Sequence, residues 1–520
     1  LGYQNNPKYI VSISTDGTNW QEIYSDSNAW DAGSVFCWNS TDRQIVTRYL
    51  KLTPNSETSN DSLLELVFQD ADGNLLMPVN EKDYHALFDE QDMFEGRQSW
   101  SNGTYFDEVY HARTAYEMVH HLYCYENTHP PLGKIFIALG VSIFGMNPFG
   151  WRFMGTLFGV LMVPIIYIFA KKMFKETWIS GITTLMFAFD FMHFAQTRIA
   201  TIDVFVTLFI MLSYFFMFCY TRKSFYDTSL KKTFIPLGLC GIAMGFSWAC
   251  KWTGIYSSIG LCLIFFIVMG KRFSEYLYAS KNPNGTTEGI LHKDIIDTFY
   301  KKFWKTIAFC CGFFVAIPAA IYTLSYIPFS DGTGHGLIRR MLDNQTSMFN
   351  YHSTLNATHP YSSKWYEWPI MKRPIWYFSG EINSHLREGI SAFGNPLIWW
   401  MGIPAFLFIL YLIYKKRDRN AIYLTFGYLS QYLPWIFIGR VVFIYHYFPS
   451  VPFVTLMIGY SMKKIVDEKP KWKKAMYVYA ALVVVLFIMF YPVISGKAVD
   501  PSYVQKYLKW FDSWVLIQTW

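Results

Sequence analysis

The sequence predicts a polytopic α-helical membrane protein with a β-rich segment at its N-terminal end. Of the 520 residues, 52% are hydrophobic and only 16% are charged, which is a poor fit to a single soluble domain. Apolar runs long enough to cross a bilayer recur from residue 152 onwards. Lysines and arginines gather in short clusters between alternate runs, so the formal net charge of +7 reflects membrane topology and not a nucleic-acid partner.

Residues 1–88 are predicted to form a partial β-sandwich on the external side. The runs YIVSIS, RYLKLT and LLELVFQD are rich in β-branched and aromatic residues, and turn signals such as Asp16-Gly17 and Asp72-Gly73 separate them. The stretch VSISTDGTNWQEIY resembles the later part of a discoidin-like (F5/8 type C) jelly roll that lacks its opening strands. Such domains often bind sugars or surfaces, and a spacer or docking role is the simpler interpretation.

Ten apolar runs are each long enough to span a membrane. They lie near residues 152–170, 177–195, 199–220, 234–250, 253–270, 304–326, 396–414, 421–438, 441–462 and 475–493. Basic clusters fall in every second gap between them, as expected if those gaps are cytoplasmic. We therefore expect about ten transmembrane helices, or about eleven if one precedes Leu1.

The same alternation divides the rest of the chain. Residues 131–147 are apolar but short, and we expect an interfacial helix there, which leaves 89–150 as a first external loop. Residues 151–326 would form the transmembrane core, and 327–395 an external aromatic-rich loop. Residues 396–520 would supply further transmembrane helices and an external tail.

Charged residues gather at the predicted outer face of the membrane. Asp107 and Glu108 are adjacent in the first external loop, and Arg152 begins a predicted span. A lone charge at a helix end usually reaches the lipid headgroups. Several cations beside a carboxylate pair describe instead a site for an anionic headgroup next to a base, and both interpretations stay open on composition alone. The aromatic residues of 327–395 suit an interfacial belt or a sugar-stacking wall equally.

The eight cysteines do not suggest a metal centre. Several lie inside apolar runs, and no CxxC spacing occurs. Cys37 and Cys124 could pair if the fold brought them together. We expect neither a metal nor a cofactor.

Seven strings, in this order, are similar to the bacterial protein O-mannosyltransferases of glycosyltransferase family 39. They are FDEVYHARTAYE, THPPLGK, GWRFMGTLFG, TRIATIDVF, KWTGIY, ATHPYSSKWYEWPIMKRPIWYF and GRVVFIYHYFPSVPF. The resemblance covers roughly residues 105–495 and implies a membrane-embedded GT-C fold with a polyprenyl-phosphate sugar donor. The outer loop is too short for the MIR domain of the eukaryotic members, and the discoidin-like segment is not general in the family.

The resemblance also implies roles for individual residues. Asp107 matches the catalytic aspartate and would be the general base, while Glu108 would orient the acceptor peptide. Arg152 and Lys251 match cations that hold the donor phosphate. The other residues carried over are His129 and Lys134, which would help to close that site, and Arg198, Asp203, His359, Lys364, Trp365, Arg440 and His446, which would contact substrate or hold the scaffold.

The predicted function is therefore transfer of mannose from polyprenyl-phosphate mannose to Ser/Thr hydroxyls of proteins, by a single inverting displacement at the outer face of the plasma membrane. One alternative is a GT-C enzyme with another lipid-linked sugar or a non-protein acceptor. Another is a transporter or sugar-binding receptor, against which the charges lie at one face and no inverted repeat is evident. The acceptor proteins and the oligomeric state are not predictable from the sequence.

Overall fold

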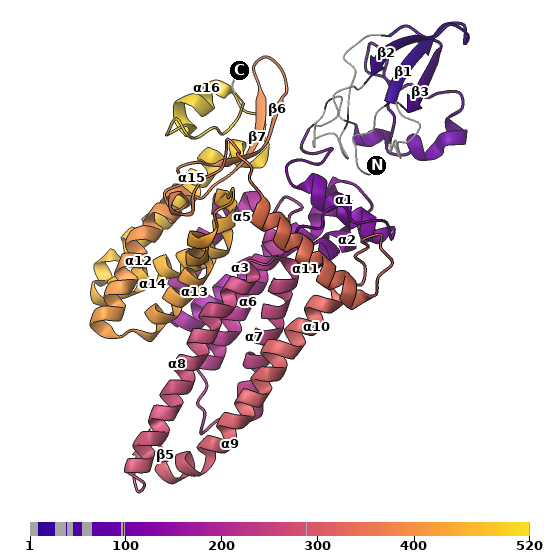
Figure 1. Ribbon diagram of the computed structural model, residues 1–520. Coiled ribbons are helices and arrows are strands. Elements are labelled where there is room, and N and C mark those ends of the chain that lie inside the picture. Colours follow the sequence, from indigo (N-terminus) through magenta and orange to yellow (C-terminus); the bar gives the residue numbers. More distant parts are fainter. Residues whose placement is uncertain are drawn as a thin grey trace.

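The computed structural model describes residues 9–25, 38, 45–54, 65–94, 97, 99–287 and 289–518. Near the N-terminus, β1 (Tyr9–Ser14), β2 (Gln21–Ser25) and β3 (Tyr49–Pro54) form an antiparallel sheet in the order β2-β1-β3. Figure 1 shows this sheet apart from the helical body. Two of the predicted strands are thus confirmed. Residues 65–70 contribute only an isolated bridge between Gln69 and Leu75, and the described residues do not establish a discoidin-like sandwich.

The first two α-helices follow the sheet. They are α1 (Glu108–Val119) and α2 (Leu132–Phe144), and they pack against each other. The 13 residues of α2 reach only about 20 Å, too little to cross the roughly 30 Å hydrocarbon core of a bilayer. A short helix at 131–147 was expected, and its position along the membrane surface stays a prediction.

Seven helices of the described chain are long and apolar enough to cross a membrane. They are α3 (Pro148–Phe174), α6 (Asp203–Thr221), α7 (Leu230–Cys250), α8 (Gly254–Lys281), the continuous run from α9 (His292–Cys311) through the π-helical turn η4 (Gly312–Ala316) to α10 (Ile317–Leu324), α12 (Pro396–Lys416), and α15 (Lys473–Ser495) with the turn that precedes it. Each coincides with a predicted span.

The other three predicted spans fold as shorter or interrupted helices, so the predicted count of ten is not confirmed. Residues 177–195 divide into α4 (Thr177–Ala188) and α5 (Phe191–Gln196), because the carboxylate of Asp190 caps α5 by accepting the His193 N–H. The remaining two regions contain α13 (Arg419–Tyr432), the 3₁₀ turns η6 (Leu433–Phe437) and η7 (Ile444–Ser450), and α14 (Val451–Glu468).

The predicted external segment 327–395 is ordered around one helix and one hairpin. Helix α11 (Leu337–Thr354) precedes the antiparallel pair β6 (Ile375–Glu381) and β7 (Arg387–Ala392), and Figure 1 shows these at the same end of the bundle as α1 and α2. Helix α3 begins, α6 begins and α7 ends at this end. The chain therefore brings Arg152, Asp203 and Lys251 to the same end as Asp107.

Candidate active site

Asp107 is the residue just before α1, and the backbone that leads into it is strained. Phe106, just before it, has a φ of 52°, a region that residues other than glycine rarely adopt and that is concentrated at functional sites. The Phe106 ring stacks on Tyr377 of β6 with centroids 4.3 Å apart, which holds this conformation. The backbone next to Asp107 is thus held in one conformation, which fixes the position of the Asp107 carboxyl.

The Asp107 carboxyl is half-buried and has no hydrogen bond or ion pair to any other side chain or backbone N–H of the described chain. Burial raises its pKa to about 7, and Lys251 opposes this rise while Asp203 and Glu126 add to it. A carboxyl with this pKa exchanges a proton near neutral pH, which is the range in which a general base works best.

Glu108, the next residue, has the opposite environment. Its side chain is 0% exposed, and Arg152 at the start of α3 donates to it from Nε and Nη2, both at 2.7 Å. The backbone N–H groups of Tyr105 and Ala200 also donate to it, at 3.2 and 2.9 Å. Glu108 therefore joins α1, α3 and the segment just before α6, and both of its oxygens are occupied by the scaffold.

Asp203 and Lys251 form a buried ion pair beside Asp107. Asp203 is the first residue of α6 and Lys251 follows the last residue of α7, and Nζ lies 2.8 Å from Oδ1. The same ammonium lies 5.7 Å from the centre of the Tyr445 ring. Lys251 has three N–H donors, and within the described residues only one is hydrogen-bonded, so the others are available to an anionic ligand.

A second buried ion pair, between Lys134 and Glu126, supports the loop between α1 and α2. Lys134 is 0% exposed and donates to the Glu126 carboxylate, to the Glu126 carbonyl at 2.8 Å and to the His129 carbonyl at 3.0 Å. Burial opposes ionisation of Glu126, yet Lys134 and His129 hold its pKa well below the usual range. All three donors of Lys134 are thus used within the protein.

Glu126 also orients His129. Its Oε1 lies 3.0 Å from His129 Nδ1, and because a carboxylate only accepts, Nδ1 carries the proton. Burial lowers the pKa of His129, and the Glu126 carboxylate opposes that fall. The ring lies 6.1 Å from His111 and 5.7 Å from His352, measured between centroids.

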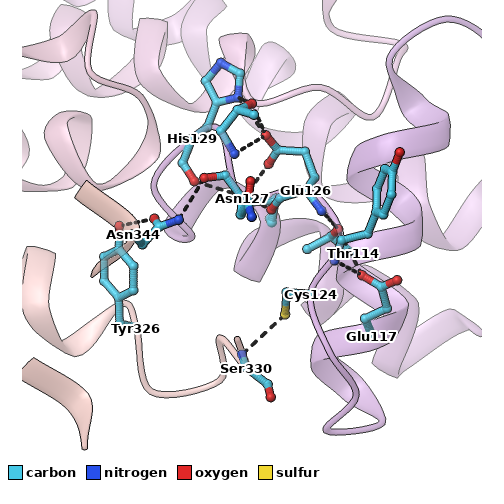
Figure 2. Close-up of polar contacts among 12 residues, drawn as sticks. Thr114, Glu117, Cys124, Glu126, Asn127, His129, Tyr326, Ser330 and Asn344 are labelled. Carbon is cyan, nitrogen blue, oxygen red and sulfur yellow. Dashed lines mark hydrogen bonds and ion pairs between the residues drawn. The ribbon is translucent and has the colours of Figure 1, made fainter. Parts of the chain in front are cut away.

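Helix α11 and the chain before it fix this loop in place (Figure 2). Asn344 donates to the Asn127 carbonyl at 2.8 Å and accepts from the Tyr326 hydroxyl at 2.8 Å. Cys124 N–H donates to the Ser330 carbonyl at 2.8 Å. Cys124 is a buried free thiol. Its suggested partner, residue 37, lies outside the described residues.

Arg440 has no acidic partner within the described residues. It lies in the segment between η6 and η7, and within the described residues its guanidinium bonds only to the Val441 carbonyl, at 3.3 Å. Its positive charge interacts electrostatically with the side chains of Tyr445 and His352. Arg440 and Lys251 therefore face the same neighbourhood with unused donors.

The remaining candidates have mainly structural surroundings. Arg198 donates to the Ser495 carbonyl at 3.1 Å and so caps the end of α15. His446 is buried, with its Nδ1 3.0 Å from the Phe443 carbonyl.

The three candidates of the outer segment lie nearer the surface. His359 is exposed, with its ring 5.0 Å from Phe443. Lys364 is exposed, and Trp365 packs at 5.3 Å against Tyr432. Within the described chain, none of these three residues has a recorded contact with Asp107.

Sequence reasoning missed Glu126 and Asn344. Glu126 lies two residues before the THPPLGK string, and its spacing from Lys134 across the Pro130-Pro131 turn is the signal that could have found it. Asn344 stands in an amphipathic helix, where nothing in the local pattern distinguishes it from a solvated amide.

Comparison with known families identifies the family of this chain. Residues 97–329 match the family described as dolichyl-phosphate-mannose-protein mannosyltransferase, and residues 337–514 match the C-terminal four-transmembrane region of protein-O-mannosyltransferase. The chain belongs to the protein O-mannosyltransferase family. The expected resemblance is thereby confirmed for the membrane part, and the members of this family are enzymes.

Bacterial relatives match along most of their length. One is the polyprenol-phosphate-mannose–protein mannosyltransferase of Corynebacterium glutamicum, 25% identical over 442 residues, covering 74% of this chain and 81% of the relative. The protein of the same name from Mycolicibacterium smegmatis is 26% identical over 467 residues, covering 79% of this chain and 87% of its own.

A solved structure shares the fold. The Saccharomyces cerevisiae protein O-mannosyltransferase Pmt1-Pmt2 complex bound to the sugar donor matches with a TM-score of 0.65 and 14% identity, over 80% of this chain and 90% of that chain. The membrane body thus has the GT-C fold.

Proposed function

We propose that this protein O-mannosyltransferase transfers mannose from polyprenyl-phosphate mannose to Ser or Thr hydroxyls of proteins, with Asp107 as the general base. The observation that carries the proposal is the state of the Asp107 carboxyl. It alone of the acidic pair lacks a protein partner in the described chain, and burial raises its pKa to about 7. The names of the bacterial relatives support the donor and the protein acceptor.

The chemistry needs a base and a cationic environment for the leaving phosphate. The acceptor oxygen attacks the anomeric carbon of mannose while its proton passes to Asp107, and the bond from that carbon to the phosphate oxygen breaks. Negative charge grows on the departing phosphate, where fixed cations lower the barrier most. One displacement inverts the anomeric configuration, without a sugar–enzyme intermediate.

Lys251 and Arg440 are the cations best suited to hold that phosphate. Both retain unused N–H donors, and Lys251 acts directly on Asp107 in the electrostatics of the site. A phosphate that is held here lies beside the base. Asp107 would thus accept the proton of the attacking hydroxyl, while the cations would stabilise the departing phosphate in the same displacement.

Three other residues receive different roles in this proposal from those that the sequence suggested. The guanidinium of Arg152 would have to exchange the buried Glu108 carboxylate for a donor phosphate, and Glu108 is too occupied to orient a peptide. Lys134 has no unused donor. We therefore assign Arg152 and Glu108 to the positioning of Asp107 on α1, and Lys134 to the positioning of Glu126 and His129.

Parity of the basic clusters supports a site on the extracytoplasmic side of the plasma membrane. The clusters at 171–175 and 222–232 lie at the opposite ends of α3, α6 and α7 from Asp107. The donor would therefore be used from the outer leaflet, where secreted acceptors arrive.

The test is direct transfer by the purified, lipid-reconstituted full chain. With polyprenyl-phosphate mannose and a Ser/Thr-rich peptide, mass spectrometry should show a hexose increment on a hydroxyl residue. Asp107→Asn should reduce turnover by about 10² to 10⁴ with little change in donor binding. Asp331→Asn, on the exposed outer segment, is the matched control and should keep normal turnover.

Two results would contradict the proposal. If Asp107→Asn turns over at the wild-type rate, this carboxyl is not the base. If hexose transfer occurs equally from polyprenyl-phosphate glucose, or appears only on lipid and never on peptide, the substrate assignment fails.

A further inference from the structure

A cavity of about 490 Å³ opens at the end of the helical bundle remote from Asp107. The last turns of α3 and α6 and the first turns of α7 line it. Lys172 in its wall lies 20 residues after Arg152 on the same helix, which separates the two by about 30 Å. The cavity is therefore distinct from the region of the donor phosphate.

Five cations surround this cavity: Lys172, Lys175, Arg222, Lys223 and Lys232. Within the described residues none of them forms an ion pair with a carboxylate. Arg222 donates to the neutral side chain of Asn420 and lies 4.8 Å from the centre of the Phe218 ring. The cavity thus has strong positive charge that the protein does not neutralise.

Neighbouring cations at the same end are treated differently. Lys463 pairs with Glu176 and Asp467, and Lys464 pairs with Asp418. Other basic residues at this end, such as Lys171 and Lys469, also lack a carboxylate partner within the described residues, but they do not line the cavity. Uncompensated charge around one hollow is what an anionic ligand requires.

The part of the cavity that lies deeper along the helices has an apolar lining. Lys232, Ile235 and Leu239 follow one face of α7, with the lysine at the end of the bundle and the apolar side chains successively deeper. Ile235 and Leu239 are 55% and 39% exposed, so this face is open. On α6, Arg222 and Phe215 repeat the arrangement, with the cation outermost. A ligand that matches both the cationic and the apolar part of the cavity has an anionic headgroup and hydrocarbon chains.

We propose that this cavity binds the phosphate headgroup of an anionic glycerophospholipid of the leaflet opposite the catalytic site. The cations contact the headgroup, and Ile235, Leu239 and Phe215 contact the first part of the acyl chains. The site is independent of the mannose donor and of the proposed transfer reaction.

Native mass spectrometry of the detergent-purified full chain tests the proposal. The probes are phosphatidylglycerol and phosphatidylcholine with identical acyl chains. Phosphatidylglycerol should be retained at least about tenfold better, since several basic residues near one headgroup each add to the attraction. Lys175→Gln/Lys223→Gln/Lys232→Gln should abolish that preference.

A matched control removes the same number of charges at the same end. Lys469→Gln/Lys471→Gln/Lys474→Gln alters exposed lysines outside the cavity and should keep the preference. If both triple variants lose it equally, the attraction is diffuse and the proposal fails. Size-exclusion profiles and melting temperatures verify folding, and the single substitution Lys232→Gln, expected to weaken retention severalfold, replaces any triple variant that does not fold.

Two further measurements separate a lipid from a free anion. Ile235→Ser/Leu239→Ser leaves every charge in place and should still weaken retention of phosphatidylglycerol severalfold. Inorganic phosphate at an equal concentration should not displace the lipid. Full displacement by phosphate, or unchanged retention in the serine variant, would show that the cavity binds only an anion and would overturn the proposal.

Discussion

Opposite shifts of the pH profile should follow from substituting the two partners of one ion pair. Asp107 is the proposed base, and its pKa is raised to about 7 by burial, with Lys251 opposing the rise and Asp203 adding to it. Because the ionised form accepts the proton, kcat/KM should increase with pH and level off above about 7. Lys251→Met removes a charge that favours ionisation, so its profile should move to higher pH. Asp203→Asn removes a charge that disfavours ionisation, so its profile should move to lower pH.

The size of each shift follows from the geometry. Asp203 and Lys251 lie 2.8 Å apart, so in the intact pair their effects on Asp107 partly cancel. A single nearby charge usually shifts a carboxyl pKa by about 1 to 3 units. Asp107 is only half-buried, so the lower end applies, and we expect roughly one pH unit in each direction.

The assay is kcat/KM for peptide mannosylation between pH 5.5 and 9, measured on reconstituted enzyme. Lys251→Met should also lose turnover because the phosphate loses a ligand, but the position of the acid limb is independent of that amplitude. Shifts of both variants in the same direction, or an unshifted midpoint in both, would refute the assignment of Asp107 as the titrating base.

The same pKa predicts a stability effect. Burial raises the pKa of Asp107 in the folded protein from its usual value of 3.8 to about 7. The folded protein therefore has a stability contribution from the protonated carboxyl at low pH, and it loses this contribution as pH rises through about 7. Asp107→Asn removes that loss. Its melting temperature should exceed that of the wild type at pH 8 and match it near pH 4, and a lower melting temperature at pH 8 would contradict the burial argument.

Three other predictions concern the surroundings of the base. Arg440→Ala should raise the donor KM about 10- to 100-fold and Arg440→Lys should recover part of it, as donor titrations would show; an unchanged KM removes Arg440 from the phosphate site. Lys134→Met should destabilise the fold by about 3 to 5 kcal/mol by leaving Glu126 charged and unpaired, and adding Glu126→Gln should restore much of the melting temperature unless the pair is dispensable. A cysteine introduced at Lys364 should react with an impermeant reagent on intact cells and one at Lys416 should not, and the reverse pattern would invert the topology.

The sequence predicted the helical layout well wherever a span is continuous. Seven predicted spans coincide with long apolar helices, because length and hydrophobicity alone determine them. The run at 177–195 was predicted as one helix, and the structure divides it. The Asp190 carboxylate accepts the indole N–H of Trp399 at 2.9 Å and the backbone N–H of Asn395 at 3.1 Å. Both partners lie about 200 residues away, so no local pattern reveals that the acid caps a new helix there.

Pairing between charges was the other part that the sequence did not reveal. Arg152 was expected to hold the donor phosphate because the family resemblance implies that role, and its predicted location at the beginning of a span agrees with its place at the start of α3. Its bidentate contact with Glu108 depends on how α1 packs beside α3, which residue type and spacing do not determine. Lys134 and Glu126 differ in the same way, since a loop folded around Pro130 and Pro131 brings them together.

The proposed separation of roles between Asp107 and Glu108 follows from the helix itself. Successive side chains at the start of an α-helix point about 100° apart, so two adjacent acids cannot face the same partners. Glu108 turns toward α3 and the segment just before α6, where Arg152 neutralises it, the Ala200 N–H donates to it, and both contacts fix the rotation of α1. That rotation directs Asp107 away from the same donors, toward the Lys251 pair. The buried salt bridge thus occupies donors that could otherwise offset the burial of Asp107, and a change at Glu108 should act on turnover through the position of Asp107.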